Sequence, residues 1–106
     1  MNKFLDLDKT VDELMKDEID VVVAKNPKAQ LEDVIESFLK GCDAAIECQE
    51  QTMKTSSTSS DAQLACRDHI KRIREIKKAI EDMTPEDRKK YTGYLEAARV
   101  AKKLSR

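Results

Sequence analysis

The clearest pattern in the chain is a row of apolar positions between residues 61 and 83. Its members lie alternately four and three residues apart, and they are Ala62, Cys66, His69, Ile73, Ile76, Ile80 and Met83. A seven-residue repeat of this kind is typical of a helix that packs along another helix. It predicts a helix over residues 61–83 with a helical partner.

A second amphipathic pattern covers residues 27–54. Apolar residues recur at steps of three and four, namely Leu31, Val34, Ile35, Phe38, Cys42, Ala45, Ile46 and Met53. The opposite face carries Glu36, Lys40, Asp43, Glu47 and Glu50. Asn26 followed by Pro27 favours a helix start at residue 27, because Pro tolerates the first helical position. The spacing predicts a helix over residues 27–54.

The two predicted helices are joined by a run of Ser and Thr over residues 55–60, which we expect to be flexible. Its last residue, Ser60, forms a capping-box pattern with Gln63. Because the link is short and each helix exceeds twenty residues, the segments 27–54 and 61–83 should form an antiparallel hairpin.

Two further helices are expected at the ends of the chain. Thr10 and Glu13 form a capping-box pattern that predicts a helix over residues 11–25. Thr84 followed by Pro85 predicts a helix over residues 85–104. Residues 1–106 are therefore expected to be a single all-α domain. Its terminal helices complete the hairpin into a four-helix bundle, either within one chain or across a dimer.

Composition narrows the class of protein. Two Gly, two Pro and no Trp among 106 residues disfavour tight hairpins of strands. No apolar run is long enough to span a bilayer, and the first residues lack the pattern of a signal sequence. Three cysteines suit a reducing compartment better than a disulfide framework. We expect a cytoplasmic protein without membrane contact.

Charge is divided unevenly along the chain. Residues 1–61 hold 7 basic and 14 acidic residues, whereas residues 62–106 hold 13 basic and 7 acidic ones. One face of the helix at 61–83 carries a basic row, defined here as the basic stripe: Arg67, Lys71, Arg74 and Lys78. Such a stripe could bind nucleic acid. Without interleaved aromatic residues, it is better explained by pairing with Glu36, Asp43, Glu47 and Glu50, within the chain or between subunits.

A metal site or a catalytic centre is conceivable but weakly supported. The candidate ligands are Cys48, Cys66 and His69, yet their spacing does not match that of known zinc sites. The same thiols and imidazole could be read as nucleophile and base, but a chain with two Gly offers little loop for an active site. Carboxylates at helical spacing, such as Asp33 with Glu36 and Glu47 with Glu50, could hold Mg²⁺ but also suit a solvated face. We expect no cofactor, no bound metal and no enzymatic activity.

Gly93 lies between Tyr91 and Tyr94 in the predicted last helix, where a Gly costs about 1 kcal/mol relative to Ala. Either a close contact uses the space, or Tyr91 packs inward and Tyr94 is half exposed.

The favoured hypothesis is a small adaptor, inhibitor or assembly factor that binds another protein through helical surfaces and is itself a homodimer. Its contact residues, chosen because we expect them to be exposed, are Arg67, Lys71, Arg74, Lys78, Tyr94 and Arg99. The alternatives are a nucleic-acid-binding module and a metal-binding bundle.

Overall fold

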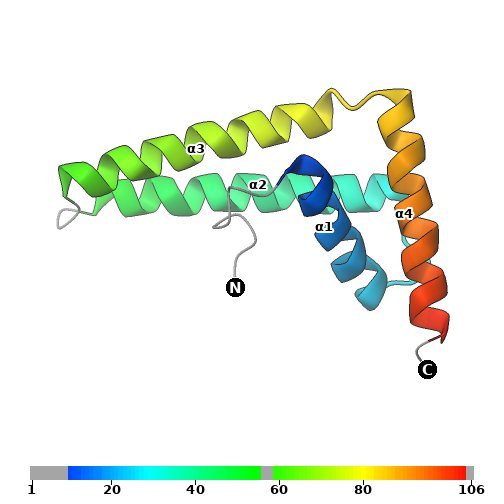
Figure 1. Cartoon of the computed structure of the whole chain (residues 1–106). Helices are drawn as coiled ribbons and strands as arrows, with labels where there is room; N and C mark the ends of the chain where they lie inside the picture. The colour runs from blue at the N-terminus through cyan, green and yellow to red at the C-terminus, as the bar shows by residue number, and fades with distance from the viewer. Residues whose placement is uncertain (1–9, 56–58, 105–106) are drawn as a thin grey trace.

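The computed structural model describes residues 10–55 and 59–104, which form four helices and no strand. They are α1 (Val11–Lys25), α2 (Leu31–Lys54), α3 (Ser60–Glu81) and α4 (Pro85–Leu104). α2 and α3 form an antiparallel hairpin and are the most extensively packed pair (Figure 1). The predicted all-α class and the predicted hairpin are thus confirmed. Residues 56–58 of the Ser/Thr link lie outside the described residues.

Short side chains at the helix starts satisfy the first backbone amides, as the sequence predicts. Thr10 Oγ1 accepts a hydrogen bond from the Glu13 amide at 3.3 Å, and Thr84 Oγ1 accepts one from the Asp87 amide at 3.1 Å. At the third start the cap is Ser59, which accepts from the Ala62 amide at 3.1 Å. The predicted capping residue, Ser60, is instead the first residue of α3.

Two further predicted boundaries are wrong. α2 begins at Leu31 and not at Pro27, because Asn26 ends α1 and starts a turn: its backbone amide donates to Val22 O at 2.8 Å. The start of α2 is capped by Asp33 Oδ2, which accepts from the Gln30 amide at 2.8 Å. α3 ends at Glu81, two residues earlier than predicted.

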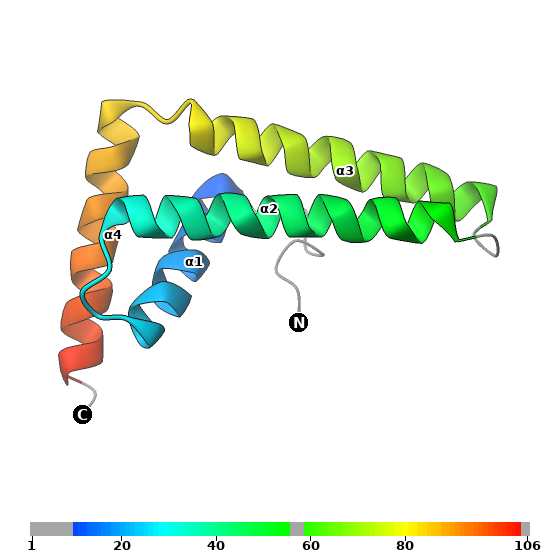
Figure 2. The same cartoon turned by 180° about the vertical axis from the view of Figure 1, so that it is seen from behind.

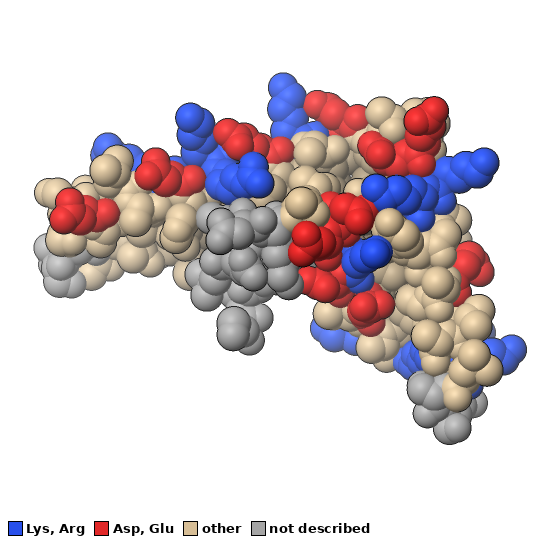
Figure 3. Space-filling model, viewed as in Figure 1, with Lys and Arg blue, Asp and Glu red and all other residues tan. Residues whose placement is uncertain are grey.

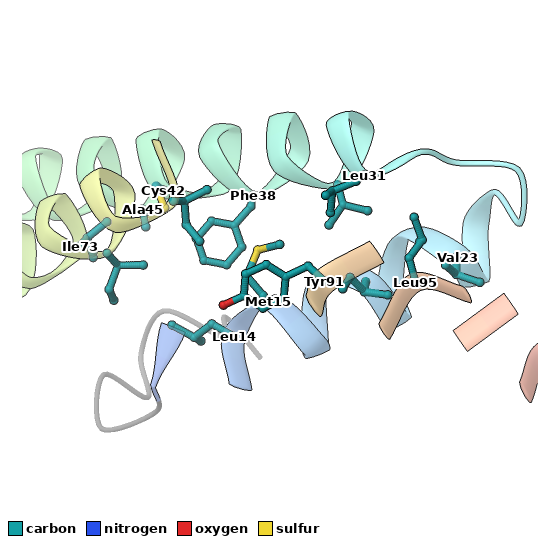
Figure 4. Packing of buried hydrophobic residues seen from close by; sticks show 14 residues of the cluster. Leu14, Met15, Val23, Leu31, Phe38, Cys42, Ala45, Ile73, Tyr91 and Leu95 are labelled. Carbon is teal, nitrogen blue, oxygen red and sulfur yellow. The ribbon is translucent and has the colours of Figure 1, made fainter. Parts of the chain in front are cut away.

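One hydrophobic core draws side chains from all four helices (Figure 4). Its centre is Phe38 of α2, which is 0% exposed, and Met15 of α1 points toward it. α3 contributes Ile73, Ile76 and Ile80, and α4 contributes Tyr91 and Leu95. Burial of these apolar side chains is the main term that holds the helices together.

The terminal helices pack on each other at one end of the hairpin. α4 runs across that end, and α1 lies obliquely against the N-terminal part of α2 (Figures 1 and 2). A four-helix bundle whose helices run side by side within one chain is therefore not confirmed. α1 and α4 instead pack mainly on each other, and both cross the hairpin at steep angles.

The hairpin extends well beyond this core. The core ends at Ala45 on α2 and Ile73 on α3. Past these residues, in the segments 46–54 and 60–72 that we call the distal hairpin, the buried side chains are Cys66 and Ile70. Leu64 in this part is 58% exposed. The distal hairpin is thus a two-helix projection with little internal burial.

Crossing a bilayer requires a long and strongly apolar helix, and the described part of the chain contains none.

Candidate functional site

A groove of about 570 Å³ runs between α2 and α3 and extends along the distal hairpin. We call it the cationic groove. Its lining residues are Glu50 and Met53 from α2 and Arg67, Ile70, Lys71, Arg74, Glu75 and Lys78 from α3. All four residues of the basic stripe therefore line one surface feature, and their spacing of four, three and four residues along α3 keeps them on one side of the helix.

The floor of the groove is apolar. Ile70 is 7% exposed, and Met53 is half-buried beside it. The four cationic side chains stand exposed at the rim. An apolar floor between charged walls is the arrangement that binds one face of an amphipathic helix.

The basic stripe has no ionic partner among the described residues. Where α3 forms ion pairs, it uses other cations: Lys77 Nζ lies 2.7 Å from Asp43 Oδ1, and Arg72 lies 3.5 Å from Glu75. The hydrogen bond with Asp43 raises the pKa of Lys77. The predicted pairing of the stripe with α2 inside one chain is therefore wrong for these residues. Lys77, on the side of α3 that faces α2, makes that contact instead.

The groove lies on the side of α2 that faces away from α1. α1 is joined to α2 by a hydrogen bond of 2.6 Å in which Ser37 Oγ donates to Glu18 Oε1. Glu50 follows Ser37 by 13 residues, which corresponds to about 220° of rotation around an α-helix. The two residues are therefore on opposite sides of α2. In Figure 2, α1 passes behind α2, and no described helix lies in front of the hairpin.

The uneven charge of the sequence is visible on the folded surface. On the face in Figure 3, acidic side chains gather over α1, whereas acidic and basic side chains are interspersed along α3 and at the beginning of α4.

Arg99 does not fit the prediction of an exposed contact residue. Its side chain is 23% exposed, and Nε donates to Pro27 O at 3.0 Å while Nη2 donates to Ala29 O. Next to it, Lys102 Nζ donates to Val23 O at 3.1 Å and to Ala24 O at 2.6 Å. Lys102 thus donates to two of the last carbonyls of α1, where a positive charge interacts favourably with the negative end of the helix dipole. Arg99 therefore connects α4 to the α1–α2 connector.

Tyr94 is half-buried between α1 and α4 rather than exposed. Its hydroxyl lies 3.4 Å from Asp12 Oδ1, and Lys16 Nζ lies 4.7 Å from the centre of its ring. Lys90 Nζ also lies 2.6 Å from Asp12 Oδ1, and this hydrogen bond lowers the pKa of Asp12. Burial raises the pKa of Tyr91, the inward-facing neighbour. These residues position α1 against α4.

Gly93 is exposed, and a Cβ atom built on it would meet no atom within 4 Å in the described part of the chain. Among the described helices, no close crossing requires this glycine. Tyr91 packs inward and Tyr94 is half-buried, as the alternative account predicts.

The candidate metal ligands are not brought together. Cys66 is buried, Cys48 is exposed and His69 is half-buried. Among the described residues there is no group of three or more His, Cys, Asp or Glu side chains that could hold a metal ion. Asp33, one of the carboxylates considered for Mg²⁺, caps the start of α2.

Comparison with models of protein families, with curated proteins and with solved structures gives no match to this chain. Any function must therefore be argued from the residues themselves.

Proposed function

We propose that the protein is a small, non-enzymatic interaction module that binds another polypeptide in the cationic groove. The observation that supports this best is that all four residues of the basic stripe line an apolar-floored groove and have no ionic partner among the described residues. A complementary partner is an amphipathic helix with apolar residues on one side and Asp or Glu beside them. A cytoplasmic adaptor, inhibitor or assembly factor would work in this way.

Nucleic acid suits the groove less well. Glu50 and Glu75 lie among its lining residues, and each would repel a phosphate backbone. No aromatic side chain is present among the described lining residues to stack on a base. The apolar floor formed by Met53 and Ile70 favours a polypeptide over a phosphate backbone.

Fluorescence anisotropy with two labelled probes tests this proposal. One probe is a designed helical peptide with Leu on one face and Glu beside it, and the other is a short DNA duplex. We expect the peptide to bind and the duplex not to bind at physiological salt. The variant Arg74→Gln/Lys78→Gln should weaken peptide binding, whereas the matched variant Lys89→Gln/Lys103→Gln, on exposed positions of α4, should not.

Absence of peptide binding would overturn the proposal. So would tight binding of the duplex that falls steeply with added salt and is lost in Arg74→Gln/Lys78→Gln, because that behaviour is typical of contacts to phosphates.

A further inference from the structure

Resting on the proposed function, we propose that the occupant of the cationic groove is α2 of a second copy of this chain. The two hairpins then pack face to face and complete a four-helix arrangement that one chain does not form alone.

The side of the hairpin that carries the cationic groove has both a basic and an acidic row of side chains, and such a dimer needs both. α3 supplies the basic stripe, and the neighbouring side of α2 supplies an acidic row. That row consists of Glu36, Asp43, Glu47 and Glu50, whose positions fall within about 60° of one another around the helix. Glu47 and Glu50 are exposed, and within the described residues no ion pair involves either of them. Unpaired acids therefore lie beside unpaired bases on one face.

A two-fold axis that runs along the hairpin, between two facing copies, puts α2 of each copy over α3 of the other. The acidic row of each copy then meets the basic stripe of the other copy. Each helix is antiparallel to the helix that it faces. An axis across the hairpin would instead put α2 over α2 and bring acids together. The charge pattern thus selects one of the two face-to-face arrangements.

The positions along the hairpin also agree. Rotation about a lengthwise axis leaves each residue at its own level, so the pairs that meet between copies are those already at one level within a chain. Asp43 is level with Lys77, because the two form an ion pair in which Lys77 Nζ lies 2.7 Å from Asp43 Oδ1. Glu50 lines the groove together with Arg67. Asp43, Glu47 and Glu50 of the second copy therefore face the stretch of α3 that carries the basic stripe, and Met53 and Ile70 of both copies lie within the same contact.

The available area is sufficient for a specific contact. Helices of 24 and 22 residues are about 35 Å long, and two side by side are about 20 Å wide. A face of this size buries roughly 600 Å² per copy, or about 1,200 Å² in total, which is the lower end of the range for specific interfaces. We therefore expect a reversible dimer rather than a permanent one.

The test uses sedimentation velocity of the full chain and two charge-reversed variants. In the acid-reversed variant, Glu47→Lys/Glu50→Lys, bases face bases in the homodimer. In the base-reversed variant, Arg67→Glu/Lys71→Glu, acids face acids. Each variant alone should dimerise at least about tenfold more weakly than the original chain. An equimolar mixture should form a heterodimer, because both contacts are again between opposite charges.

The mixture keeps the test decisive if the reversals also weaken the hairpin, since loss of folding would not be repaired by mixing. The control variant Lys89→Glu/Lys103→Glu changes the same amount of charge on α4 and should dimerise like the original chain. An original chain that stays monomeric at about 100 μM, or variants that dimerise undiminished, would overturn the proposal. A monomeric chain that still binds the acidic peptide in the groove would overturn the second-copy inference alone and leave the proposed function standing.

Discussion

Removal of the Arg99 guanidinium should destabilise the protein without affecting the cationic groove. The substitution Arg99→Met keeps an unbranched apolar stem of similar length and removes the donors to Pro27 O and Ala29 O. Ala29 is 1% exposed, so water cannot easily replace the lost donor at its carbonyl. Pro27 is exposed, and water can replace the donor there.

The expected loss of stability follows from the different exposure of the Ala29 and Pro27 carbonyls. A buried acceptor left without its donor costs about 1–3 kcal/mol, whereas an exposed one costs little. Loss of the i,i+3 pair with Glu96, whose atoms are 2.6 Å apart, adds a few tenths of a kcal/mol. We expect a total of about 2 kcal/mol. For a chain of 106 residues this lowers the melting temperature by about 8–10 °C.

Differential scanning calorimetry and urea unfolding at a fixed protein concentration measure this change. The matched control is Lys103→Met, which removes a charge at an exposed position of the same helix and should change stability by less than about 0.5 kcal/mol. Peptide affinity should be the same for Arg99→Met and the original chain. The reasoning is refuted if Arg99→Met melts like the control, or if it retains its stability and loses peptide binding.

Three substitutions and one additive test the rest of the structure. Gly93→Ala should stabilise the protein by up to about 1 kcal/mol, because the added Cβ meets open space inside a helix; destabilisation in urea unfolding would contradict this. Asp12→Asn should cost up to about 1 kcal/mol at neutral pH. Since the pKa of Asp12 is lowered from its ordinary value of 3.8, its contribution is present above that pH and lost as the pH falls further below it. The difference in melting temperature between Asp12→Asn and the original chain should therefore decrease progressively as the pH falls below 3.8; a constant difference would exclude the ion pair as its cause. Phe38→Ala should cost about 3–5 kcal/mol, because the ring is 0% exposed at the centre of the core; a loss below about 1 kcal/mol in urea unfolding would show that this core is loosely packed. A chelator should leave the melting temperature unchanged, and a large decrease would show that the protein does hold a metal ion.

The helices could be predicted from the sequence because their signals are local. Apolar spacing marks the inner faces of α2 and α3, and Thr10 and Thr84 cap helices where the pattern places them. The sequence predicts the start of α2 at residue 27 instead of Leu31, because an Asn such as Asn26 can either cap the start of one helix or end another. That choice depends on the turn that residues 26–29 form, which is held by a hydrogen bond of 3.0 Å from the Ala29 amide to Asn26 O.

The placement of α1 and α4 could not be predicted, because it depends on contacts between residues far apart in the sequence. Arg99 lies more than 70 residues from the carbonyl of Pro27 that it binds. Nothing in the local pattern distinguishes Arg99 from an exposed surface cation. The same holds for Tyr94, whose neighbours Asp12 and Lys16 come from the other end of the chain.

The candidate site was predicted in part. The basic stripe is a local feature of α3, and its regular spacing identified all four cations. The opposite wall was missed, since Glu50 and Met53 join the groove only through the register of the hairpin. That register also explains why Lys77, and no member of the stripe, pairs with Asp43.

The most direct test of the central claim is amide hydrogen exchange of the full chain with and without the acidic helical peptide, at a concentration where the protein is monomeric. The account predicts that exchange in the distal hairpin is fast in the free protein, because its backbone is poorly covered, and slows strongly when the peptide is bound. Protection should appear within residues 46–54 and 60–78 and be absent from α1 and α4. Protection confined to α1 or α4, or no change anywhere while the peptide is bound, would contradict the claim that the cationic groove is the docking surface.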